Sequence, residues 1–178
     1  MFKNIIILFI LFTTNLYAHH LPKCPGEKRN FSTWVNCSGT MPGEGHTYSG
    51  DLDAEGKYSG YGILKKEKEG MLYEGEILKD KFHGKGKVIW SGEKKFSYDG
   101  DWFMGNWHGK GRLESHDENG NHDGEFSYEG EFQNYAMTGY GTLCWKGVCA
   151  TGNWKDGNCN DEETCKQVKA ANEALANQ

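Results

Sequence analysis

The sequence predicts an all-β protein: an open antiparallel meander of stacked β-hairpin repeats that forms one elongated sheet, followed by a short C-terminal helix. Composition is the first observation. The 178 residues include 25 Gly, about twice the usual share of roughly 7%, and only 3 Pro. Aromatic residues are also abundant, with 9 Tyr, 9 Phe and 6 Trp. The third observation is a glycine motif that recurs at a nearly fixed spacing.

These numbers also exclude other classes of protein. Collagen needs glycine at every third position and far more proline. A disordered chain lacks aromatic residues at this density. A helical bundle does not tolerate so many glycines, because each interior Gly costs about 1 kcal/mol relative to Ala. A turn-rich repeat array remains.

The first element is an apolar leader at residues 1–18. Lys3 precedes an unbroken apolar run at residues 5–12, and Ala18 is a small residue suited to signal peptidase. The run is too short to cross a bilayer. The sequence therefore predicts a signal peptide and an exported protein, which is periplasmic in a Gram-negative host or secreted.

Six cysteines follow this leader, an even number that indicates disulfide bonds in an exported chain. Six cysteines allow 15 connectivities, and the sequence alone does not choose among them. Local proximity favours three pairs: Cys24 with Cys37, Cys144 with Cys149, and Cys159 with Cys165. Zinc is the competing interpretation, but no C-x2-C pair is present.

The repeat array is predicted at residues 48–158, after an N-terminal cap at 19–47 that includes a partial repeat. The motif Y-x-G-[DE] begins at Tyr48, Tyr73, Tyr98 and Tyr128. Each copy is followed by G-x-G, which begins at Gly60, Gly84, Gly109 and Gly139. The offset is 12 residues in the first copy and 11 in the other three, and the copies are 25, 25 and 30 residues apart.

Alternation along the strands assigns the two faces of the sheet. Tyr73, Gly75 and Ile77 share one face, and Glu74 and Glu76 share the other. Two inward columns follow: Leu52, Ile77, Trp102, Phe132 and Trp154 on first strands, and Leu64, Val88, Leu113 and Leu143 on second strands. Glycines beside these columns leave room for large rings. The opposite face carries acidic first strands and basic second strands, which indicates a ladder of cross-strand pairs; a ligand-binding acidic stripe is the alternative.

The last segment, 159–178, is predicted to cap the far edge of the sheet. Residues 160–163 form a helix-capping signature, and Cys165, Val168, Ala171 and Leu175 recur near helical spacing. A short C-terminal helix follows from this pattern.

The repeat pattern resembles the MORN (membrane occupation and recognition nexus) repeat, which reads roughly Y-x-G-[DE]-[WF], a turn, then H-G-x-G and a hydrophobic residue. Residues 98–113 match this closely, as do residues 73–88. The resemblance covers about residues 34–158. The first repeat departs from it with one extra residue in its turn, and the stretch between Gly111 and Tyr128 is longer than usual.

No catalytic residue, cofactor or metal is predicted. His83 and His108 recur with the repeat, so we interpret them as turn residues, and the paired carboxylates follow the β pattern. Residues 119–124 match a calcium loop in part, but position 12 is Gly130 where an EF-hand needs Glu. His19 and His20 would begin the mature chain, where an N-terminal His can bind copper given a second His from a rigid fold.

The charge balance argues against two classes of partner, nucleic acid and membranes. Lys and Arg number 20 against 25 Asp and Glu, for a net charge of −5 and an isoelectric point near 5.8. No basic footprint for nucleic acid exists, and membrane binding is disfavoured.

The resemblance implies a non-enzymatic, exported MORN repeat protein that acts as a protein-interaction or scaffolding module, with its partner and oligomeric state left open. The alternative is an aromatic groove that binds a glycan or a lipid headgroup. Its candidate residues are Tyr48, Tyr73, Tyr98, Trp102, Trp107 and Tyr128. The same rings also fit the core of a thin sheet.

Overall fold

The computed structural model describes residues 21–25, 34–92, 95–117 and 121–176. The predicted signal peptide and the His19–His20 pair lie outside this range. Within it, no helix has the length and apolar character that crossing a membrane requires.

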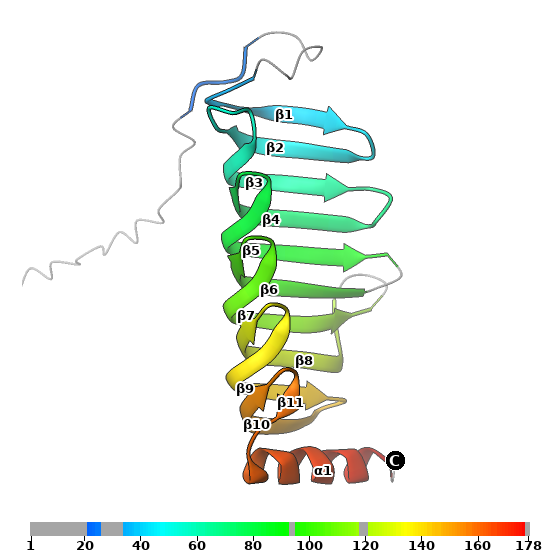
Figure 1. Cartoon of the computed structure of the whole chain (residues 1–178). Coiled ribbons are helices and arrows are strands. Elements are labelled where there is room, and N and C mark those ends of the chain that lie inside the picture. Colours follow the sequence, from blue (N-terminus) through cyan, green and yellow to red (C-terminus); the bar gives the residue numbers. More distant parts are fainter. Residues whose placement is uncertain (1–20, 26–33, 93–94, 118–120, 177–178) are drawn as a thin grey trace, which may run out of the picture.

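One antiparallel sheet of eleven strands forms the molecule, and every strand pairs with its neighbours in chain order. The strands are β1 (Cys37–Gly43), β2 (His46–Leu52), β3 (Tyr58–Lys66), β4 (Met71–Leu78), β5 (Lys81–Ser91), β6 (Lys95–Phe103), β7 (Asn106–His116), β8 (His122–Gln133), β9 (Ala136–Trp145), β10 (Val148–Lys155) and β11 (Asn158–Cys159). The helix α1 (Glu162–Ala176) lies along the end of the sheet, next to β10 (Figure 1). The predicted meander of hairpins and the C-terminal helix are both confirmed.

Side chains alternate between the two faces as the motif predicts. In β4, buried and exposed residues alternate along the whole strand, starting with buried Met71. The first inward column is buried throughout: Leu52, Ile77, Trp102, Phe132 and Trp154. In the second column Leu64 and Val88 are buried, and Leu113 and Leu143 pack on the core while partly exposed.

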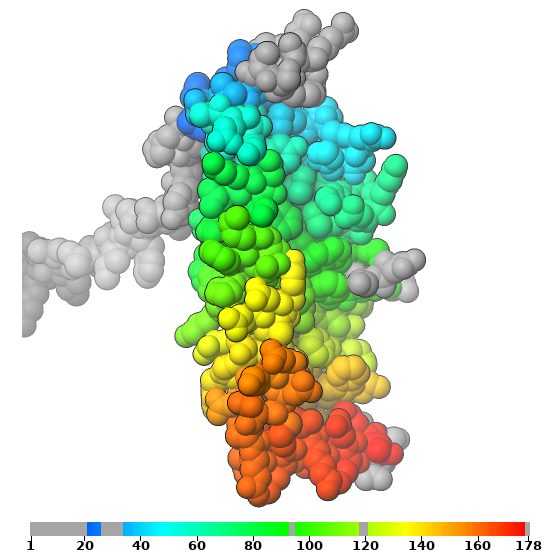
Figure 2. All heavy atoms as spheres, in the orientation of Figure 1, coloured from blue at the N-terminus to red at the C-terminus, as the bar shows by residue number. Residues whose placement is uncertain are grey.

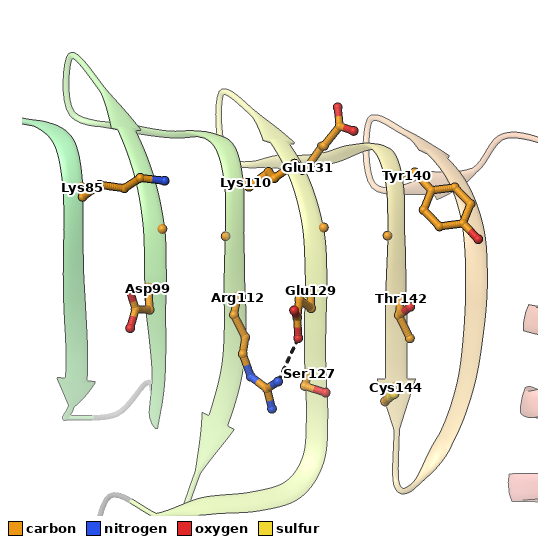
Figure 3. Close-up of a pocket in the computed structure, with 14 residues that line it drawn as sticks. Lys85, Asp99, Lys110, Arg112, Ser127, Glu129, Glu131, Tyr140, Thr142 and Cys144 are labelled. Atoms are coloured by element: carbon orange, nitrogen blue, oxygen red, sulfur yellow. Dashed lines mark hydrogen bonds and ion pairs between the residues drawn. The ribbon is translucent and has the colours of Figure 1, made fainter. Parts of the chain in front are cut away.

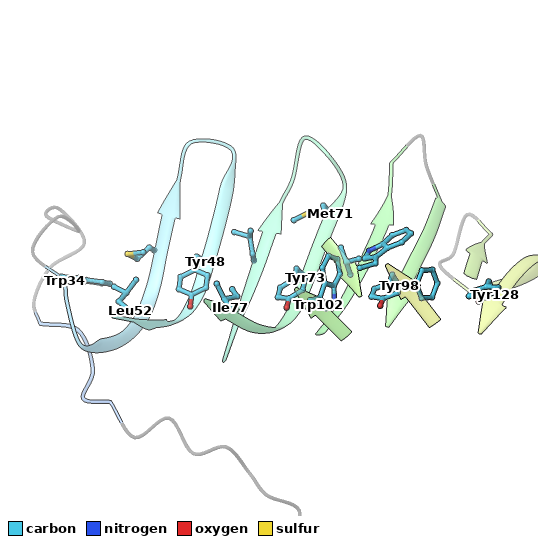
Figure 4. Packing of buried hydrophobic residues seen from close by; sticks show 14 of the residues in the cluster. Trp34, Tyr48, Leu52, Met71, Tyr73, Ile77, Tyr98, Trp102 and Tyr128 are labelled. Carbon is cyan, nitrogen blue, oxygen red and sulfur yellow. The ribbon is translucent and has the colours of Figure 1, made fainter. Parts of the chain in front are cut away.

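A single sheet encloses a core here because each hairpin folds back over its own inner face. Pairing between β4 and β5 breaks after Gly75, and similar breaks follow Gly50, Gly100 and Gly130. Beyond the break, the Phe82 ring stacks on the Tyr73 ring with centroids 3.7 Å apart. The core therefore lies between the sheet and a layer of turns (Figure 4). In the space-filling view these turn segments form a column along the length of the molecule (Figure 2).

The buried tyrosines explain the paired glycines of the motif. The Tyr73 hydroxyl donates a hydrogen bond to the Glu76 carbonyl at 2.6 Å and lies against Gly75 and Gly86. A Cβ atom on Gly86 would overlap that hydroxyl, so a larger residue at this position would displace the ring. Burial raises the pKa of Tyr128 to about 12 and raises that of Tyr73 further, which keeps both hydroxyls as donors.

All six cysteines form disulfide bonds, in the pairing that local proximity favours. Cys24–Cys37 joins the N-terminal segment to β1, and Cys159–Cys165 joins β11 to α1. Cys144 and Cys149 are directly opposite each other on β9 and β10, with Cα atoms 4.1 Å apart.

Candidate interaction surface on the outer face

The outer face is the side of the sheet opposite the tyrosine core, and its middle strands carry alternating charges. One row crosses β4 to β8 in register: Glu74, Lys87, Asp99, Arg112 and Glu129. A second row beside it comprises Glu76, Lys85, Asp101, Lys110 and Glu131. In both rows each cation lies between two anions. The predicted charge ladder is therefore present, two residues deep over five strands.

Ion pairs within the ladder are exposed to solvent. Arg112 Nη1 lies 3.0 Å from Glu129 Oε2, and their side chains are 49% and 69% exposed. Lys85 also pairs with Asp101. Exposed pairs of this kind contribute about 0–1 kcal/mol to folding. Because these ion pairs contribute little to the stability of the fold, a partner can bind to the charged side chains without destabilising the sheet.

The acidic residue of the motif has a second role that the sequence interpretation missed. Asp101 Oδ2 accepts a hydrogen bond from the backbone N–H of Lys110 at 2.9 Å, and Glu76 Oε1 does the same for Lys85. Each of these N–H groups follows a glycine with positive φ, as at Gly109 (54°), where the strand bulges. The fixed spacing between the acidic residue and this glycine is the sequence pattern from which the hydrogen bond could have been predicted.

A shallow groove of about 840 Å³ crosses the outer face from β5 to β9. Its lining includes Gly100, Gly111, Gly130 and Gly141, whose backbone forms the floor between the two rows of charged side chains. Charged side chains of both rows stand on either side (Figure 3). Tyr140 lies at the β9 end of the groove and is 61% exposed.

A tyrosine replaces the lysine of the second row at each end of the ladder. The central residue of G-x-G is Lys85 or Lys110 in the middle repeats but Tyr61 in the first and Tyr140 in the last. The Tyr61 hydroxyl donates a hydrogen bond to Glu74 Oε1 at 2.8 Å. The ladder therefore ends at an exposed aromatic ring on each side.

The six rings proposed for an aromatic groove do not lie on a surface. The tyrosines Tyr48, Tyr73, Tyr98 and Tyr128 are fully buried, and Trp102 and Trp107 are 4% and 8% exposed. The turn layer covers them, so a ligand could reach them only by opening the core. This part of the sequence interpretation is corrected, and the competing assignment of these rings to the core of a thin sheet fits their burial.

The motif histidines lie in strands and pack on one exposed ring. His83 and His108 flank Phe103, with ring centroids 5.5 and 5.6 Å away. The backbone N–H of Met104 also donates to His83 Nδ1 at 3.4 Å. They belong to β5 and β7 rather than to a turn, and their contacts are structural.

The partial calcium loop is described only in part, because residues 118–120 lie outside the described chain. Asp117 Oδ1 accepts the Asn121 N–H at 2.9 Å, and Asp123 Oδ1 accepts the Glu125 N–H at 2.9 Å. Among the residues that the structure describes, no group of three or more His, Cys, Asp or Glu side chains is placed to hold a metal ion.

Comparison with known proteins gives one family. Residues 73–92, 98–119 and 128–147 each match the family model described as MORN repeat. These segments contain most of the hairpins β4–β5, β6–β7 and β8–β9. No curated protein matches the chain.

Proposed function

We propose that the protein is an exported, non-enzymatic interaction module that binds a protein partner along its outer face, since three of its hairpins match the MORN repeat model. MORN repeats are consistent with a protein-interaction role. The observation that carries the proposal is the two-row charge ladder over β4 to β8 with the groove between its rows.

A ladder of this kind favours a protein over a lipid or a nucleic acid. Its cations alternate with anions, so it presents no continuous positive patch to phosphates, and the chain as a whole carries a net charge of −5. A complementary partner would present opposite charges at the strand spacing of about 4.8 Å. Complementarity of this sort sets register and specificity more than affinity.

Export is supported by the predicted leader and by the three disulfide bonds, which persist in oxidising compartments. The mass of the protein recovered from the exported fraction tests this directly. Cleavage after Ala18 is expected, and a full-length cytosolic protein with free thiols would contradict it.

Exchanging one cross-strand pair tests the binding face. The double variant Lys87→Glu with Asp99→Lys keeps the net charge and the opposite signs across β5 and β6 but inverts the ladder locally. Proteins cross-linked to the wild type in its native compartment should be lost from this variant. The matched control exchanges Glu55 and Lys57, an exposed pair at 2.8 Å in the β2–β3 connection. Retention of the same partner by the ladder variant would overturn the proposed face.

A second candidate function is glycan recognition at the β9 end of the groove. It is favoured by the exposed ring of Tyr140 beside Thr142 and Glu131, since a sugar stacks on such a ring and bonds to such oxygens. Tyr140→Lys installs the residue of the middle repeats and should leave the fold intact. Saturable thermal stabilisation by a sugar, lost in Tyr140→Lys, would establish this function; the absence of stabilisation across a glycan panel would exclude it.

A further inference from the structure

The first repeat contains a wide, open cavity on the inner face, about 520 Å³ in volume. The sheet and the layer of turns both contribute to its wall: Met41, His46, Leu64 and Lys66 from β1 to β3, and Gly56, Tyr58 and Asp80 from the turns and the start of β3. This volume is within the range of small-molecule sites, roughly 300–1,000 Å³.

The cavity coincides with a departure from the repeat. Three inward positions that surround it carry His46, Tyr58 and Lys66 in the first copy. The second copy has apolar residues at the same positions: Met71, Phe82 and Trp90. There the Trp90 ring stacks on Phe96 of the next repeat, with centroids 4.5 Å apart, and takes up the equivalent space.

Polar groups converge on the cavity from both layers. His46 Nε2 lies 3.3 Å from the Tyr58 hydroxyl. Asp80 Oδ1 accepts the Tyr58 N–H at 2.8 Å, and the Asp80 side chain is exposed to solvent. Lys66 pairs with the exposed Glu69 carboxylate, with its ammonium 3.4 and 3.3 Å from the two oxygens.

The polar residues of the cavity come from different elements, and its wall also includes apolar side chains. Lys66 and His46 lie at adjacent ends of β3 and β2, whereas Asp80 belongs to the turn between β4 and β5. Met41 and Leu64 are buried and contribute the apolar part of the wall. One ligand that satisfies all of these groups carries a negative group, a positive group and an apolar body.

We propose that this cavity binds a small zwitterion with an apolar side chain, of the free amino-acid class. Its carboxylate is directed to Lys66 and His46, its ammonium to Asp80, and its side chain to Met41 and Leu64. The inference is independent of the protein-binding face, because the cavity lies on the inner side of the sheet.

Three probes of one shape test the charge requirement by titration calorimetry on the unreduced protein. Leucine carries both charges, leucinamide lacks the carboxylate, and 4-methylpentanoate lacks the ammonium. Saturable binding of leucine, with at least tenfold weaker binding of the other two, is expected. Equal binding of all three, or no binding of leucine at millimolar concentration, would overturn the proposal.

Variants taken from the later repeats close the cavity without introducing a foreign residue. Lys66→Trp and His46→Phe place there the residues found at the equivalent positions of other copies. Each should keep the melting temperature or raise it while leucine binding is lost. Asp80→Asn retains an oxygen that accepts the Tyr58 N–H, and it should weaken leucine binding at least tenfold. Lys65→Ala, one residue away on the outer face, is the control and should bind as the wild type. Undiminished binding in Lys66→Trp would refute the site.

Discussion

The two edges of the sheet are closed by different means. At the N-terminal edge, backbone meets backbone: Cys24 N donates to Ser38 O at 2.9 Å, and Ser38 N donates to Pro22 O at 2.8 Å. At the C-terminal edge, side chains of the helix region replace a strand. The Thr151 N–H donates to Gln167 Oε1 at 2.9 Å, and the Asn153 N–H donates to Asp161 and Thr164.

This difference teaches that an open repeat sheet can be terminated without a special end repeat. Unpaired edges recruit other strands, so each exposed N–H is a liability. The first edge relies on a covalent tether, Cys24–Cys37, to hold a short segment in place. The second relies on a helix whose buried Thr164 is 1% exposed and whose own tether is Cys159–Cys165.

The largest expected effect on stability comes from removing the disulfide bonds that hold the two edges. Cys24 and Cys37 are 13 residues apart, against 6 for Cys159 and Cys165. Because the stabilisation grows with the loop that is closed, replacing the first pair by Ser should lower the free energy of unfolding by about 3 kcal/mol and the second by about 2 kcal/mol. Urea denaturation of both double variants measures this. A larger loss at the C-terminal pair would show that holding α1 against the sheet, and not loop entropy, sets the contribution of that bond.

The next effect concerns the helix hydroxyl at the C-terminal edge. Thr164→Val keeps the shape but removes the oxygen that accepts the Asn153 N–H at 3.1 Å and donates to Asp161. The Asn153 N–H keeps its hydrogen bond to Asp161 at 3.0 Å, so only the hydrogen bonds of the Thr164 hydroxyl are lost, and the free energy of unfolding should fall by about 1 kcal/mol. Thr164→Ser is the matched control and should lose less. Hydrogen exchange at Asn153 should accelerate in the valine variant alone; equal rates would place the protection elsewhere.

A pH dependence distinguishes the two edges further. Hydrogen bonds from the Thr164 N–H and hydroxyl and from the Asn153 N–H lower the pKa of Asp161 from 3.8 to about 2. The folded pKa lies below the unfolded one, so the contribution to stability is complete above pH 4 and is lost as the pH falls to about 2. The fall in melting temperature across this window should shrink in Asp161→Asn. An unchanged fall in that variant would assign the acid sensitivity to other carboxylates.

The sequence predicted the hairpins, the inward columns and the helix because each is encoded by local spacing. It left two assignments open for the aromatic rings, a ligand groove or the core of a thin sheet. Alternation assigned Tyr73 and Trp102 to one face, but nothing local indicates that the turn beyond the Gly75 break folds over that face. The hydrogen bond from the Lys110 N–H to Asp101 was likewise not predicted, because it depends on the positive φ of Gly109 at the bulge.

The first-repeat cavity was within reach of the sequence. Aligning the four copies places His46 and Lys66 where the second copy has Met71 and Trp90. A polar residue at an inward position of an otherwise apolar column is a visible departure. The sequence alone could not show that these residues line a cavity, because only the folded turn layer brings Asp80 next to them.

The smallest effect on stability is expected at Pro42, near the end of the edge strand β1. Pro42 and Thr40 share the orientation of Ser38, whose N–H points away from β2. A proline there removes one donor from the edge, as edge strands often do to avoid pairing. Pro42→Thr restores that donor and should change the free energy of unfolding by less than about 0.5 kcal/mol.

The Pro42→Thr substitution should change the self-association of the protein more than its stability. Light scattering on the eluting protein should show a concentration-dependent dimer for Pro42→Thr, since two adjacent outward donors would then be available to a second edge. Adding Thr40→Pro moves the proline by two residues, returns the donor count to that of the wild type and should restore the monomer fraction. If Pro42→Thr elutes as the wild type at every concentration, the Cys24 tether alone closes this edge, and the two ends of the sheet are more alike than their contacts indicate.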